Sequence, residues 1–144
     1  MFETILACSI LLDVEMMSDA EYREHLDELF IANPENDFLL DLEWCFSDVQ
    51  KAISLIREYF YDKKVDYNVL GIFLMEKLEK VYLHGEMDFK LFASQIYKIW
   101  TLLPNEVHEV QPFWTMSYAD DPLSWGDEKQ SRELYEDMFT FYRK

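Results

Sequence analysis

Glycine and proline are scarce in this chain, and no long hydrophobic run interrupts its charged residues. Three glycines and four prolines in 144 residues are too few for a loop-rich β-sandwich or a low-complexity tail. No segment approaches the roughly 18 uninterrupted apolar residues of a membrane span. The two cysteines, Cys8 and Cys45, lie in apolar surroundings without a C-x-x-C pair, which favours buried thiols in a reducing compartment. We therefore expect a cytoplasmic protein that has no membrane partner.

Sequence motifs for catalysis and for metal binding are also missing. The chain contains no G-x-S-x-G, no P-loop and no G-x-G-x-x-G, which are the usual signatures of nucleophilic and phosphate-binding sites. His25, His84 and His108 are isolated from one another, and none has the H-E-x-x-H spacing of a metal site. We therefore expect no enzyme activity, no cofactor and no metal ion.

Acidic and aromatic residues are what the chain has in abundance. It carries 29 acids against 13 bases, a net charge of −16, and 17% of its residues are aromatic. So much aromatic side chain supplies a hydrophobic core, which a disordered acidic chain lacks. A phosphate backbone would be repelled by this charge, so we expect no nucleic-acid partner. The length predicts a single domain over residues 1–144.

Apolar residues recur with helical periodicity over most of the chain. Ser18 and Glu21 form a capping box before one helix, and Ser47 and Gln50 form another. Asp88 and Asp127 are placed to cap two later helices. We expect helices over residues 2–17, where a strand remains possible, over 19–32, 35–46, 66–84 and 88–103, and from about 49 and 127 onward.

Residues 104–126 interrupt this pattern with three prolines and four aromatic residues. We expect a structured loop with a short strand at 107–110. The loop either inserts its aromatic side chains into the end of the bundle or forms a pocket wall with Asp120 and Asp121. The predicted fold is therefore an all-α, single-domain helical bundle of about five to six helices, with an aromatic-rich loop before the last helix.

The negative charge is concentrated in the first third of the chain. Residues 1–50 have a net charge of −12, because their 13 acids face one base, Arg23. Residues 51–103 have a net charge of +1, and residues 104–144 have −5. An uneven charge distribution of this kind indicates association with partners of opposite charge and says little about the fold.

Helical geometry places part of this charge around apolar side chains. At about 100° per residue, the face of helix 19–32 opposite Tyr22, Leu26 and Leu29 presents Glu24, Asp27, Glu28 and Ile31. In segment 35–46, three residues lie within roughly 60° of one another, with Phe38, Leu42 and Phe46 on the opposite, buried side: Asp37, Asp41 and Trp44. An apolar anchor inside a charged rim is typical of protein–protein interfaces. The alternative is an ordinary solvated face with Trp44 in the core.

The combination of small size, helical pattern and clustered acids resembles the small acidic immunity proteins of bacterial toxin systems, including polymorphic-toxin and contact-dependent inhibition systems. The stretch Asn33-Pro34-Glu35-Asn36-Asp37-Phe38-Leu39-Leu40-Asp41 carries this resemblance. Tyr59-Phe60-Tyr61 is similar to the paired tyrosines of nuclease-colicin immunity proteins. The resemblance implies a basic toxin domain as the partner, bound through Glu24, Asp27, Glu28, Asp37, Asp41 and Trp44.

Three other function classes stay open at this point. The chain is alternatively a nucleic-acid mimic that inhibits a DNA-binding protein, which requires carboxylates spaced like phosphates. A carboxylate-dependent enzyme would place two acids in one pocket, and a structural subunit would expose a large apolar patch. The sequence does not set the identity of the partner or the oligomeric state.

Overall fold

The computed structural model describes residues 1–45 and 47–143, and all regular secondary structure within these ranges is helical. No helix in the described residues is long and apolar enough to cross a membrane. The chain divides into two compact units, Met1–Asp66 and Tyr67–Lys144, which we describe separately. The all-α prediction is confirmed, whereas the prediction of a single domain stays a prediction.

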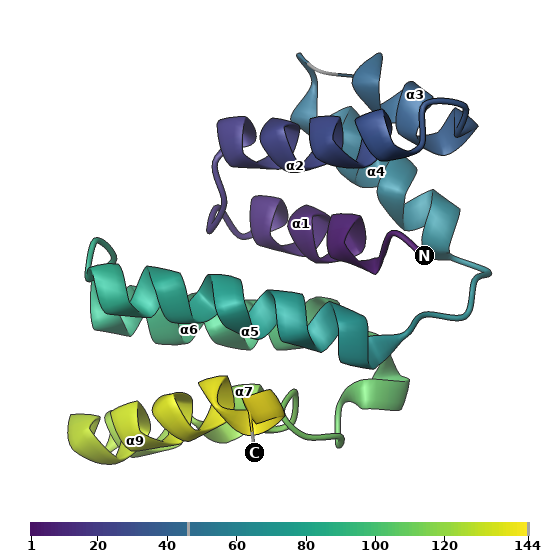
Figure 1. The fold of residues 1–144 in the computed structure, drawn as a ribbon. Coiled ribbons are helices and arrows are strands. Elements are labelled where there is room, and N and C mark those ends of the chain that lie inside the picture. The colour runs from purple at the N-terminus through teal and green to yellow at the C-terminus, as the bar shows by residue number, and fades with distance from the viewer. Residues whose placement is uncertain (46, 144) are drawn as a thin grey trace. The chain divides into compact units, whose positions relative to one another are not determined.

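The described residues of the first unit form four helices. α1 packs against α2 and α4, and α3 packs against α2 and α4 in turn (Figure 1). Ile5, Cys8 and Leu11 of α1 are fully buried. Cys45, which follows α3, is also buried. The helices are α1 (Glu3–Asp13), α2 (Asp19–Ala32), α3 (Asp37–Glu43) and α4 (Val49–Phe60).

Local capping sets the ends of α1 and the start of α2. Ser18 Oγ accepts a hydrogen bond from the backbone N–H of Glu21 at 3.1 Å, as the capping box predicts. The predicted helix 2–17 is too long, because Glu15 adopts a left-handed conformation at φ 59°. The N–H groups of Glu15 and Met16 then donate to the carbonyls of Leu12 and Leu11. This pair of bonds is a Schellman motif, which ends the helix.

The next helix begins later than predicted, and the one after it has a different cap from the predicted one. Asn36 caps α3 by accepting from the N–H of Leu39 at 3.0 Å, so this helix begins at Asp37 and not at residue 35. Asp48, and not Ser47, caps α4 by accepting from the N–H of Lys51 at 3.1 Å. Asn and Asp are strong N-cap residues. Asp48 lies one residue closer to its helix than Ser47, the residue that the capping-box pattern favoured. Phe46, predicted to be buried, lies outside the described residues.

The second unit has a long helix pair and several short helices. α6 contacts α7, while α9 contacts α5, α7 and α8. The segment predicted as a loop contains helical turns, so there are more helices than the predicted five to six, and residues 107–110 form no strand. The elements are α5 (Tyr67–His84), α6 (Phe89–Leu102), η1 (Asn105–Val107), α7 (Thr115–Tyr118), α8 (Asp121–Ser124), α9 (Glu128–Phe139) and η2 (Phe141–Arg143).

Aromatic rings form the centre of the second unit. Phe92 of α6 lies 5.4 Å from Tyr135 and 6.4 Å from Phe139, both on α9, measured between ring centroids. Tyr82 of α5 lies 5.5 Å from Phe92. Phe113, from the aromatic-rich segment, is also buried. Tilted and edge-to-face ring pairs at these distances stabilise a core beyond their area burial.

The corrected start of α4 gives a test of the fold. Asp48→Ala should lower the free energy of unfolding by about 1 kcal/mol, because the N–H of Lys51 loses its acceptor at the helix start. Ser47→Ala is the matched control and should change it by less than about 0.5 kcal/mol. Urea denaturation of the three proteins measures both values. A larger loss of unfolding free energy for Ser47→Ala than for Asp48→Ala would show that Ser47 is the N-cap.

Candidate functional site

Four of the seven predicted site residues lie on α2, which has one face in the core. Tyr22 and Leu26 are buried. On the opposite side of the helix, Ile31 is 78% exposed, as the sequence predicted. The three acids predicted to surround it are also exposed: Glu24, Asp27 and Glu28.

The other three predicted residues lie on or directly after α3. Leu39 and Leu42 bury one side of this short helix. Asp37 and Asp41 are exposed on it, and Trp44 caps its C-terminus with a side chain that is 78% exposed. The alternative that Trp44 belongs to the core is therefore wrong. An indole with this exposure carries a large apolar surface into solvent.

A groove of about 450 Å³ joins the two helices. The structure brings Asp27, Ile31 and Trp44 together in its lining. Glu24, Glu28, Asp37 and Asp41 are exposed on the same two helices but do not line the groove. Its complete lining is Asp27, Phe30, Ile31, Leu40, Glu43 and Trp44.

Three lining residues were missed from the sequence. Phe30 lies four positions after Leu26 of the buried face, but it is half-buried and reaches the groove. Leu40 lies four positions before Trp44, and residues at this spacing share a helix face. The four-residue spacing could therefore have predicted that Leu40 lies beside Trp44. No spacing in the sequence predicts that Glu43 lines the groove, since its position depends on how α2 and α3 pack.

Glu43 is an unusual acid within this groove. Burial disfavours its charged form, and the neighbouring Asp27 side chain adds a hydrogen bond and a like charge. Together these raise the pKa of Glu43 to about 7. Two carboxyl groups form a hydrogen bond only when one of them carries a proton. The pair therefore keeps a proton at pH values well above those at which a glutamate usually ionises. Among the described residues, Glu43 Oε1 has no hydrogen-bond partner.

Behind the groove, α2 contributes a tyrosine and the single base of the first 50 residues. Burial raises the pKa of Tyr22, and nearby thiols and Glu43 raise it further, so its hydroxyl stays protonated at physiological pH. Arg23 is half-buried and does not line the groove. In the part of the chain that the structure describes, it forms no ion pair, and its Nε has no hydrogen-bond partner. Arg23 therefore forms no ion pair with the acids of the groove.

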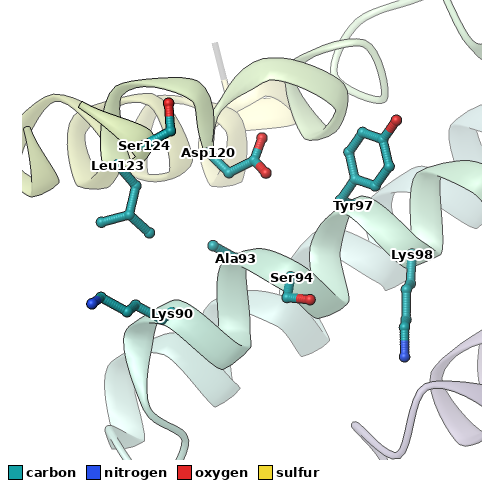
Figure 2. A pocket seen from close by; sticks show the side chains of 8 residues that line it. All are labelled: Lys90, Ala93, Ser94, Tyr97, Lys98, Asp120, Leu123 and Ser124. Atoms are coloured by element: carbon teal, nitrogen blue, oxygen red, sulfur yellow. The ribbon is translucent and has the colours of Figure 1, made fainter. Parts of the chain in front are cut away.

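A second hollow, of about 510 Å³, lies within the other unit between α6 and α8 (Figure 2). Leu123 and Ala93 extend into the space between the helices, while the Lys98 side chain extends away from Asp120. Burial raises the pKa of Asp120, an effect that Asp121 reinforces and a backbone hydrogen bond opposes. Phe113 is buried and does not line the hollow. The hollow therefore lacks converging acids and the predicted aromatic wall.

Neither hollow is a metal centre. Residues 1–45 and 47–143 contain no group of three or more histidine, cysteine, aspartate or glutamate side chains placed to hold a metal ion. His25 lies 2.8 Å from Thr4 Oγ1, and the His108 ring stacks on Trp100 at 4.2 Å between centroids. These contacts account for two of the three histidines as structural residues.

No protein-family model, curated protein or solved structure matches this chain. The class-level resemblance to immunity proteins therefore stays a hypothesis, and the geometry of the groove carries the functional argument.

The raised pKa of Glu43 predicts how stability varies with pH. The folded protein holds this proton more tightly than the unfolded chain, whose glutamates titrate near the ordinary value of 4.5. Stability from this group is present below pH 4.5 and is lost as the pH rises toward 7. Glu43→Gln keeps a hydrogen-bond donor toward Asp27 without the titration. We expect the variant to be more stable than the natural protein at pH 8, by on the order of 2 kcal/mol.

Urea denaturation at pH 4.5, 6 and 8 measures this difference. Glu24→Gln is the matched control, because Glu24 is exposed on α2 and outside the groove. Its stability should follow that of the natural protein at every pH. A difference between the Glu43→Gln variant and the natural protein that does not grow with pH would contradict the assigned pKa.

Proposed function

We propose that this chain binds and neutralises a basic protein partner, most simply the nuclease domain of a bacterial toxin, by occluding its active or substrate-binding surface. The observation that carries the proposal is the groove between α2 and α3, where exposed Ile31 and Trp44 lie among carboxylates. The proposal takes residues 1–144 to act as one domain in the cytoplasm.

The two kinds of surface have separate roles in such a complex. Carboxylates around the groove attract a basic domain and raise its association rate. A large apolar side chain that becomes desolvated at the centre of an interface slows dissociation. Trp44 and Ile31 supply the apolar part, and Asp37 and Asp41 supply charge beside it. Active sites of nucleases are basic because they bind phosphates, so an acidic surface is complementary to them.

One observation favours a second candidate, a carboxylate-dependent enzyme. A glutamate with a pKa of about 7 beside a groove has the proton affinity that a general acid or base needs at neutral pH. Asp27 is its only charged neighbour among the causes of that shift. Apolar side chains make up most of the lining, and two of them, Ile31 and Trp44, stand mainly in solvent. This exposure favours an interface over an enclosed reaction site.

The proposed complex should depend on Trp44 and on local charge in different ways. Affinity capture from the native cell should recover a protein with a basic domain, which is then purified for kinetics. Trp44→Ala should weaken its binding by about 30-fold or more, mainly through faster dissociation. The double variant Asp37→Lys/Asp41→Lys should lower the association rate about tenfold at low salt, because it reverses the attraction.

The matched control is Glu86→Lys/Glu109→Lys, which makes the same change in net charge at two exposed acids of the other unit. It should leave the association rate within about twofold. Equal effects of the two double variants would argue against a docking site at the groove. Capture of several unrelated DNA-binding proteins, with steep salt dependence, would instead support the nucleic-acid mimic.

A further inference from the structure

The groove has two chemically different parts. One part is an apolar channel bounded by Ile31, Leu40 and Trp44, and the other is the carboxyl pair of Asp27 and Glu43. The pair comes from two different helices, with Asp27 on α2 and Glu43 on α3. Glu43 is partly buried, whereas Asp27 is exposed, so a ligand that enters the groove meets the carboxylate of Asp27. An exposed carboxylate beside apolar side chains accepts hydrogen bonds from a cationic ligand.

We propose that, within the complex of the proposed function on which this inference rests, the groove receives the side chain of one arginine of the partner. The methylene groups lie against Ile31 and Trp44, and the guanidinium donates to the exposed carboxylate of Asp27, beside Glu43. The arginine thereby supplies both an apolar contact and a positive charge next to the carboxyl pair.

Arginine fits these features better than lysine or an apolar residue. Its guanidinium presents five N–H donors in a fixed plane, which suits two carboxyl groups on neighbouring helices. It is weakly hydrated and stacks on indole rings, whereas the lysine ammonium is a compact and strongly hydrated charge. An apolar side chain would fill the channel but would leave the carboxylate of Asp27 without a cation.

Binding of a guanidinium changes the protonation of the carboxyl pair. Below pH 7 the free protein holds a proton on Glu43 that hydrogen-bonds the pair together. A positive guanidinium favours two carboxylates, so this proton leaves to solvent as the arginine binds, and no covalent bond changes. Affinity for arginine should therefore rise with pH, by at least about tenfold between pH 5.5 and 8.

The other titratable groups near Glu43 do not account for this pH dependence of arginine binding. On α2, Arg23 does not contribute to the raised pKa of Glu43, and Tyr22 stays protonated because burial raises its pKa. Cys45 lies two residues after Glu43 and is buried. α4 also packs on α3, and the charged residues at its start, Asp48 and Lys51, do not contribute to the raised pKa of Glu43.

The test uses the full chain and three blocked tripeptides: acetyl-Gly-Arg-Gly-amide, its lysine analogue and its norleucine analogue. Binding is followed by NMR through the Ile31 methyl and the Trp44 indole signals at pH 5.5 and pH 8. The arginine peptide should shift both signals and bind more tightly at pH 8, with the lysine peptide weaker and the norleucine peptide weakest. Glu43→Gln should weaken arginine binding at pH 8 and remove its pH dependence, while Glu24→Gln should change neither.

Several results would overturn the inference. They are norleucine or lysine binding as tightly as arginine, no shift of the Ile31 and Trp44 signals with any peptide, and a pH dependence that persists in Glu43→Gln. If the arginine peptide fails while capture of a basic partner still depends on Trp44, the arginine assignment is wrong and the proposed function stands. If arginine binds but no such partner is captured, the proposed function is the one that fails.

Discussion

Burial of one face of α2 and one face of α3 determines the surface of the first unit. Tyr22 and Leu26 anchor α2, and Leu39 and Leu42 anchor α3. Because a helix repeats every 3.6 residues, each buried pair forces a particular opposite side outward. Ile31 and Trp44 therefore cannot reach the core while these contacts hold. Their exposure follows from the packing, and does not require a special backbone conformation: Trp44 adopts ordinary helical angles as the C-cap of α3.

The same packing creates the electrostatic character of the groove. Contact between α2 and α3 brings Asp27 and Glu43 close enough to share a hydrogen bond. Burial alone disfavours a charged carboxylate, and a second carboxylate disfavours it further. The pair therefore retains a proton near neutral pH, where an isolated surface glutamate would be ionised. A single helix–helix contact thus produces both the apolar channel and the acid whose protonation is sensitive to pH near neutrality.

Local signals in the sequence predicted a part of this arrangement. The bounds of α2 follow from Ser18 at its start and Asn33 after its end, so the outward face with Asp27 and Ile31 was predictable. The partnership of Glu43 with Asp27 was not, because helical periodicity describes one helix at a time and says nothing about which helices meet. The short helices after residue 104 were missed for a related reason: four residues make one turn, too few to display a period.

The protonated pair also links stability to binding. Ionisation of Glu43 lowers the stability of the folded protein. A surface that served only solubility would not need such a residue, since an exposed glutamate gives the same charge without a loss of folding free energy. The cost is reduced when a cation enters the groove, because the cation favours the ionised form. Sites that are destabilising in the free protein and satisfied by a ligand are typical of functional surfaces. Glu43 therefore differs from most of the other acids of the chain, which lie exposed.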